Sequence, residues 1–224
     1  FEHKVMTLDP AGAGGDELSF AAGGGTNSFI YLLSVGGFVG GTTKANIEAV
    51  IEKMLSLDIH VLDIEKNMGH GTVAALFVER LESLKNLARQ HSEDIEGWCT
   101  RLGLTMRELE SRLTQIGISE YYVTGQKERR IIDTISPITR RHKLVVSTQA
   151  IEDDWEYCQK HSPEKRLQFS AFQQMGNITY DRNSLVHDDR ADCVQRLVET
   201  LAGMLSRDEE KLSVEREEKA ISSF

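Results

Sequence analysis

Four acidic residues fall where the elements predicted from the sequence begin or end. Asp9 ends the first predicted strand, Glu65 lies near the end of a later one, and Asp188 and Asp189 open the last predicted helix. Strand ends lie at the edges of a sheet, where segments far apart in the chain can meet. We therefore expect carboxylates from three distant segments to converge at one edge of the sheet.

Such a cluster would suit a hard divalent cation. Carboxylate oxygens favour Mg²⁺ or Mn²⁺. Two such ions about 4 Å apart support in-line displacement at phosphorus, one by activating water and the other by stabilising the leaving oxygen. The same residues also fit a structural role, because Asp-Pro after a strand is a common turn and Asp is a common helix N-cap. Spacing alone leaves both interpretations open.

The elements that would position these acids follow a definite order. Hydrophobic periodicity and turn residues predict three strands in a meander and then strands that alternate with helices, as β-β-β-α-β-α-β-α-β-α. This order predicts an α/β fold with a mixed central sheet and helices on both faces. The predicted strands are residues 4–9, 17–22, 28–35, 60–66, 120–124 and 143–147, and the predicted helices are residues 43–55, 72–91, 126–141, 150–159, 163–174 and 188–205.

Glycines mark two of the predicted connections. We expect a turn at residues 23–27 and a glycine-rich connection at residues 36–41. Residues 92–117 fit two short helices, which we interpret as a helical insertion. The domain is predicted to occupy residues 1–206, with a charged tail at residues 207–224 that is either a solvated helix or disordered.

Composition and charge exclude several classes of protein. A chain of 224 residues, 40% hydrophobic and 27% charged, is typical of one globular domain. No apolar run reaches the roughly 18 residues of a membrane-spanning helix. The three cysteines form no CxxC pair, which favours a reducing compartment over a zinc ribbon or a disulfide framework. A net charge of −9 argues against a protein that coats nucleic acid, but not against an enzyme that touches it locally.

Four sequence blocks resemble one known family. They are MTLDPAG at 6–12 with GDE at 15–17, DIEKNMGHG at 63–71, GQKERRIID at 125–133 and LVHDDRAD at 185–192. In order and spacing they resemble the C-terminal nuclease domain of the large terminase subunit of tailed bacteriophages. The likeness is greatest to the short-tailed phage branch, where the subunit is also called a DNA maturase.

The resemblance implies an RNase H-like (retroviral integrase-like) fold and a metal-dependent endonuclease. Such an enzyme cuts concatemeric viral DNA when packaging begins and ends. The matching motifs imply that Asp9 and Glu65 are metal ligands. They imply a third acidic ligand at Asp188 or Asp189, and the choice between these two stays open. Asp16 is a further candidate ligand for a second Mg²⁺ or Mn²⁺ ion.

Other candidate residues surround these acids. Lys127, Arg129 and Arg130 begin the most basic stretch of the chain and could hold DNA phosphates. A solvated helix face is the alternative, and it is favoured for the distal pair Arg140 and Arg141, whereas Lys127 is the stronger candidate because it lies at the turn from strand to helix. His187 and Asp63 are expected to support ligands rather than to bind the ion themselves, and packing is an equally good role for the histidine.

Partners follow from the same resemblance. Nothing in the sequence matches the P-loop pattern GxxxxGK[ST], so we expect an isolated nuclease domain that does not hydrolyse ATP. The implied partners are double-stranded DNA, the terminase ATPase domain, the small terminase subunit and the procapsid portal, in the host cytoplasm and without a membrane. Two alternatives stay open: another RNase H-like nuclease, such as a junction resolvase or an exonuclease, and a non-catalytic docking module.

Overall fold

The structure is a computed structural model that describes residues 1–10, 17–66 and 72–222. Its centre is a six-stranded sheet with the spatial order β5-β4-β1-β2-β3-β6. The pairs β1–β2 and β2–β3 are antiparallel, whereas β4, β5 and β6 join the sheet in parallel. This mixed sheet confirms the predicted fold class. The strands are β1 (His3–Asp9), β2 (Leu18–Thr26), β3 (Phe29–Phe38), β4 (Val61–Glu65), β5 (Gly117–Tyr121) and β6 (Leu144–Val146).

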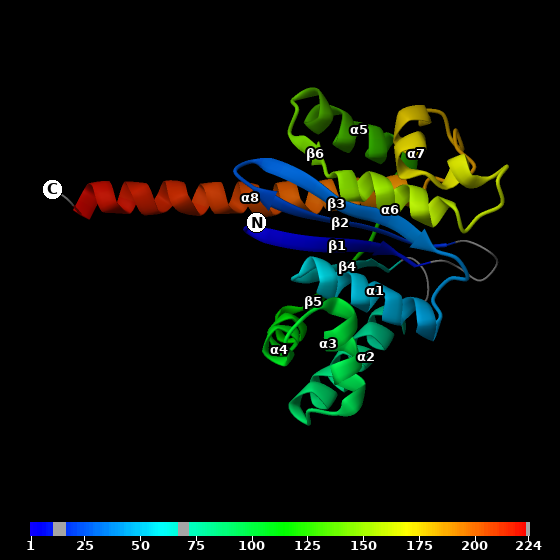
Figure 1. The fold of residues 1–224 in the computed structure, drawn as a ribbon. Helices are drawn as coiled ribbons and strands as arrows, with labels where there is room; N and C mark the ends of the chain where they lie inside the picture. The colour runs from blue at the N-terminus through cyan, green and yellow to red at the C-terminus, as the bar shows by residue number, and fades with distance from the viewer. Residues whose placement is uncertain (11–16, 67–71, 223–224) are drawn as a thin grey trace.

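Helices cover both faces of the sheet and enclose two apolar cores (Figure 1). The first core lies between the sheet and α1 to α4, and the second lies beneath α8 with contributions from α5 and α7. Helix α6 packs along β3 and supplies Tyr157 to the first core and Ala150 to the second. The helices are α1 (Lys44–Leu57), α2 (Thr72–Arg89), α3 (Glu93–Leu102), α4 (Met106–Gln115), α5 (Lys127–Arg140), α6 (Thr148–Cys158), α7 (Ala171–Asn177) and α8 (Asp189–Ser222), with a 3₁₀ turn η1 (Arg166–Phe169).

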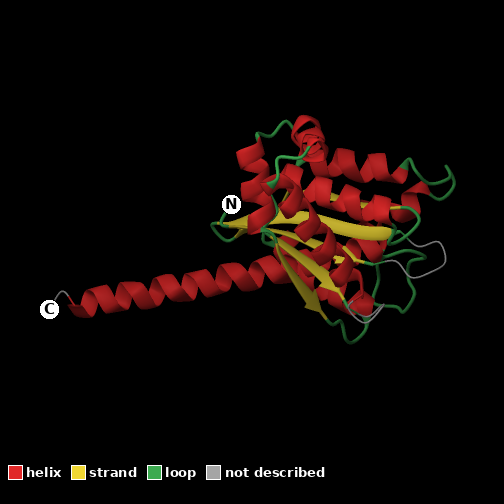
Figure 2. Cartoon of the chain, turned by 90° about the horizontal axis from the view of Figure 1, so that it is seen from below, coloured by secondary structure: helices red, strands yellow, loops and turns green. Residues whose placement is uncertain are grey.

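Helix α8 crosses strands β1, β2 and β3 and then runs on past the sheet (Figure 2). Its buried side chains include Val194, Leu197, Leu201 and Leu205, whose spacing of three and four residues defines one face of a helix. The predicted boundary between domain and tail at residues 206 and 207 therefore lies inside one continuous helix. No helix in the described part of the chain is both long and apolar enough to cross a membrane.

Most of the glycines predicted to lie in connections lie inside strands, whereas Gly40 and Gly41 do lie in the connection after β3, with positive φ values of 93° and 68°. Gly23, Gly24 and Gly25 belong to β2, and the turn that follows is Asn27-Ser28, where both residues have positive φ values of 49° and 62°. Gly36 and Gly37 belong likewise to β3. A Cβ atom built on Gly36 would lie 2.2 Å from Cδ2 of Tyr157 in α6. These glycines thus let a helix approach the sheet closely.

Other elements differ from the prediction in extent. Strand β5 begins at Gly117, three residues earlier than predicted, directly after α4. The helix predicted over residues 163–174 is divided into η1 and α7. Ser170 separates them because its hydroxyl caps α7 by accepting from the amide of Gln173. Helices α3 and α4 match the two short helices predicted over residues 92–117.

The close approach of α6 to β3 gives a stability prediction. Gly36→Ala should lower the free energy of unfolding by about 1–3 kcal/mol, the usual effect of overpacking a tight contact. Gly203→Ala in α8 is the control, because a Cβ atom there meets nothing within 4 Å, and helix propensity should raise stability by about 0.5–1 kcal/mol. Urea unfolding measures the free energy of unfolding of both variants and of the parent. A Gly36→Ala variant as stable as the parent would contradict the packing argument.

Candidate metal centre

The parallel pairing of β1 with β4 sets Asp9 beside Glu65. Leu8 pairs with Ile64, so the two acids that follow leave the sheet together at the carboxyl ends of neighbouring strands. Two residues back, Thr7 donates to the carbonyl oxygen of Cys193 in α8 at 2.8 Å. Because side chains two residues apart in a strand share a face, both acids point to the side of the sheet that α8 covers.

Helix α8 adds a third carboxylate to this pair. One carboxylate oxygen each from Asp9, Glu65 and Asp192 lie within 4.8 Å of one another, which is close enough to share a metal ion. Asp192 is buried, with 5% of its surface exposed, and the other two are partly buried. A set made only of carboxylate oxygens fits Mg²⁺ or Mn²⁺ better than a soft metal.

Asp188 and Asp189 occupy a different place in the site. Each forms an ion pair with the Nζ atom of Lys127 at 2.8 Å, and the same nitrogen lies 3.5 Å from Oδ2 of Asp192. Lys127 begins α5, which packs against α8, so the amine reaches the first turn of α8 directly. The two acids proposed as the third ligand thus surround a lysine one helical turn before Asp192.

The pKa values show how crowded the charges are. Burial, and then the negative charge of Glu65, raise the pKa of Asp9 well above its usual range, although Lys127 acts in the opposite direction. Burial also raises the pKa of Asp192, against the opposing effect of Lys127 and Arg130. For Lys127 burial alone would lower the pKa, but the surrounding aspartates outweigh it and raise the pKa. The site therefore carries more negative charge than its own basic groups neutralise.

The basic residues of α5 divide between two roles. The Nη2 atom of Arg130 donates to Oδ1 of Asp192 at 2.7 Å, so Arg130, like Lys127, contacts the acidic cluster. Arg129 is exposed on the surface of α5. The structure thus brings two of the three predicted phosphate-binding residues to the carboxylates and leaves one directed to solvent.

The remaining candidates lie around this cluster. Asp63 accepts from Arg196 at 2.9 Å and from Ser119 at 2.7 Å, one pleat behind Glu65. His187 stacks on the ring of Phe169 at 4.1 Å, in a packing contact. Asp16 lies outside the described residues, as do residues 67–71 of the DIEKNMGHG block.

Asp192 is the member of the cluster that is not predicted by its position at a strand end or at the start of a helix. It lies three residues after Asp189 and four after Asp188, so the three share one face of the helix. That spacing was the available signal. An argument from strand ends and helix starts favours Asp188 and Asp189, the first acids of the helix. Because α8 crosses over β1, however, it is the next turn of α8, with Asp192, that lies over the strand ends.

Strands β1 to β3 are antiparallel, β4, β5 and β6 extend the sheet in parallel, and acids lie at the ends of β1 and β4. These features define an RNase H-like domain with a candidate metal centre. The family model described as "Terminase Bacteriophage T7, Ribonuclease H-like domain" matches residues 8–144. The chain belongs to this terminase family, which confirms the resemblance seen in the sequence blocks.

Individual relatives agree with this assignment. The large terminase subunit of Enterobacteria phage T3 is 25% identical over 215 residues, which are 96% of this chain and 32% of that protein. The chain therefore spans about a third of the length of this relative.

Solved structures similar to this chain are also terminase nuclease domains. The human cytomegalovirus terminase nuclease domain, soaked with Mn and bound to an inhibitor, matches with a TM-score of 0.50 and 16% identity, covering 89% of this chain and 82% of that one. A mutant nuclease domain of the large terminase subunit of bacterial virus Sf6, with manganese and β-thujaplicinol, matches with a TM-score of 0.48 and 8% identity, covering 88% and 87%.

The raised pKa of Asp9 predicts how stability depends on pH without metal. A carboxyl whose pKa is higher in the folded state binds protons more tightly there, so stability falls as pH rises from 3.8 through the folded pKa. Asp9→Asn removes this effect. We expect it to stabilise the metal-free domain by about 1 kcal/mol at pH 7, a typical size for one substitution, and by less below pH 4.

Urea unfolding in EDTA at the two pH values measures this difference. Asp133→Asn is the control, because Asp133 is an exposed acid on α5 and should show no such gain at pH 7. A loss of stability at pH 7 in Asp9→Asn would contradict the repulsion inferred at the site.

Proposed function

We propose that the domain is a metal-dependent endonuclease that hydrolyses phosphodiester bonds of double-stranded DNA. The observation that carries the proposal is the convergence of Asp9, Glu65 and Asp192 within 4.8 Å at the end of the sheet. Membership of the terminase family supports it. The manganese in the cytomegalovirus and Sf6 nuclease domains supports Mn²⁺ or Mg²⁺ as the ion.

Each residue of the centre has a distinct part in the proposed mechanism. Asp9, Glu65 and Asp192 would hold the ion. A bound divalent ion lowers the pKa of a water molecule and offsets the charge of the phosphate oxygens, and a pair of ions about 4 Å apart does so on both sides of the scissile bond. Arg130 fixes the carboxylate of Asp192 through its hydrogen bond. We include Asp188 and Asp189 as candidates for a second ion, with Asp16 as a further one.

Lys127 has a double role in this proposal. Its amine contacts three aspartates and balances part of their charge when no ion is present. The same position, beside the carboxylates, would let it meet the negative charge of an incoming phosphate. Asp63 and His187 support the centre from behind, the first through Arg196 and the second by packing against Phe169.

The substrate would be long double-stranded DNA, cut with little sequence preference. Contacts to phosphates position a duplex without reading its sequence, and exposed Arg129 offers such a contact. With a net charge of −9 the domain alone should bind DNA weakly and with strong salt dependence. Delivery of DNA by other parts of the packaging machine would compensate. We propose the terminase ATPase domain, the small terminase subunit and the procapsid portal as those partners, in the host cytoplasm.

Two alternatives make different predictions. A junction resolvase or an exonuclease would use the same centre but would prefer branched DNA or DNA ends to a closed plasmid. A docking module would not need carboxylates placed together against their mutual repulsion, so the convergence of three of them within 4.8 Å argues against it.

Plasmid cleavage tests the proposal. With Mn²⁺ or Mg²⁺ the domain should nick and linearise a supercoiled plasmid, and EDTA or Ca²⁺ should prevent this. Asp9→Ala, Glu65→Ala and Asp192→Ala should each lower the rate by about 10²-fold or more, because each removes a ligand of the ion. Glu164→Ala is the control, because it removes one exposed acid outside the centre. Cleavage that persists in Asp192→Ala would contradict the assignment of this ligand.

Arg129 gives a separate prediction about DNA. Arg129→Ala should weaken DNA binding equally for different sequences and reduce the slope of log K against log salt by about 1, as expected for one lost phosphate contact. Binding of Mn²⁺ should not change. Arg107→Ala, an exposed arginine on α4, is the matched control. Equal effects of the two variants in a fluorescence anisotropy titration would show that α5 is not the DNA-binding surface.

A further inference from the structure

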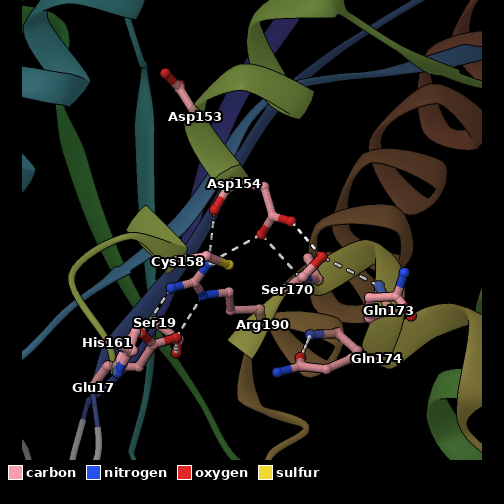
Figure 3. A network of polar contacts seen from close by, with 12 residues as sticks. Glu17, Ser19, Asp153, Asp154, Cys158, His161, Ser170, Gln173, Gln174 and Arg190 are labelled. Atoms are coloured by element: carbon pink, nitrogen blue, oxygen red, sulfur yellow. Dashed lines mark hydrogen bonds and ion pairs between the residues drawn. The ribbon is translucent and has the colours of Figure 1, made fainter. Parts of the chain in front are cut away.

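A fully buried arginine holds the first turn of α8. Arg190 has 0% of its surface exposed. Its Nε and Nη2 atoms donate to the two carboxylate oxygens of Glu17 at 2.6 and 2.8 Å, and Nη1 donates to Oδ1 of Asp154 at 3.0 Å. Figure 3 shows the guanidinium between these acids, which come from the residue before β2 and from α6. One side chain therefore ties α8 to two other elements.

The partners of Arg190 are themselves fixed by further hydrogen bonds. Ser19 donates to Glu17 at 3.1 Å, and Nε2 of His161 lies 3.1 Å from the same carboxylate. The hydroxyl of Ser170 and the amide of Ala171 donate to Asp154 at 2.7 and 2.9 Å. Because these hydrogen bonds fix the carboxylates of Glu17 and Asp154, the network determines both the direction and the depth at which the Arg190 side chain enters the protein.

Stability alone does not account for this network. A buried ion network gains little over apolar side chains of similar volume, because its charges must be stripped of water. The rest of this face of α8 packs through Val194, Leu197 and Leu201, and apolar contacts fix a helix less directionally than hydrogen bonds do. On the other side of the acidic cluster, Arg196 pairs with Asp63 at 2.9 Å. Along α8, Asp192 thus lies between two anchored arginines: Arg190 is held by Glu17 and by Asp154 of α6, and Arg196 is held by β4.

We propose that Arg190 is a positioning residue: by binding Glu17 and Asp154 it fixes the rotation and depth of α8 so that Asp192 meets Asp9 and Glu65 in a geometry that binds a divalent ion. The inference rests on the proposed metal-dependent function. Arg190 acts through Asp192 and does not itself bind the ion.

Arg190→Lys is the first test, because it keeps the positive charge and loses the fork that binds two acids. The electrostatic potential at the metal centre hardly changes, so an altered affinity would report geometry. We expect Mn²⁺ to bind about 10-fold more weakly or worse, as measured by calorimetry or by the EPR signal of free Mn²⁺. An unchanged Mn²⁺ affinity would overturn the proposal.

Asp154→Ala and Asp153→Ala form a charge-matched pair, should the lysine variant fail to fold. The two acids are neighbours on α6 and are equally buried, at 3% exposed. Asp154 binds Arg190, whereas Asp153 binds Lys53 and Ser34. Both variants should lose stability, but only Asp154→Ala should also lose Mn²⁺ affinity. Equal losses of affinity would overturn the proposal.

Amide hydrogen exchange separates this inference from the proposed function. The proposed function fails if the parent protein does not bind Mn²⁺, or if Asp9→Ala does not abolish the binding. Exchange over residues 191–195 then still tests Arg190, without metal. Faster exchange there in Arg190→Lys or Asp154→Ala than in Asp153→Ala supports the positioning role, and equal exchange overturns it.

Discussion

The repulsion among carboxylates at the end of the sheet is the constraint that the rest of the site serves. Asp9, Glu65 and Asp192 bring like charges within 4.8 Å, and Asp192 is buried while the other two are partly buried. Such an arrangement destabilises the metal-free protein, since burial and then the charge of Glu65 raise the pKa of Asp9. Lys127 and Arg130 offset part of it from α5. A divalent ion would offset the remainder, so the same repulsion that costs stability would create affinity for metal.

The fold supplies rigid elements that resist this repulsion. The parallel register of β1 and β4 determines the separation of Asp9 and Glu65, and hydrogen bonds along both strands hold it. The position of Asp192 depends on tertiary contacts of α8 instead. Glycines in β2 and β3 allow helices to approach the sheet: a Cβ atom at Gly23 would lie 2.8 Å from a side-chain atom of Leu197 in α8. Close packing and the Arg190 network together hold the third carboxylate in place.

The predictions that held depend on local pattern. The order of strands and helices, and the position of Asp9 and Glu65 at strand ends, follow from hydrophobic alternation and turn residues, so the mixed α/β sheet could be predicted. The place of Asp192 follows from the rotation of α8 against β1, which long-range contacts such as the one between Glu17 and Arg190 determine, 173 residues apart. No local pattern contains that information. For the same reason local pattern predicts turns at the glycines of β2 and β3, because the helices that require these glycines lie far away in the sequence.

The most direct test of the central claim is a crystal structure of the domain with Mn²⁺, with anomalous scattering used to locate the ion. We expect a peak between Asp9, Glu65 and Asp192, with a carboxylate oxygen of each at about 2.1–2.3 Å, and Lys127 still beside Asp188 and Asp189 or displaced from them by a second ion. A peak bound by Asp188 or Asp189 without Asp192, or one remote from the ends of β1 and β4, would contradict the account.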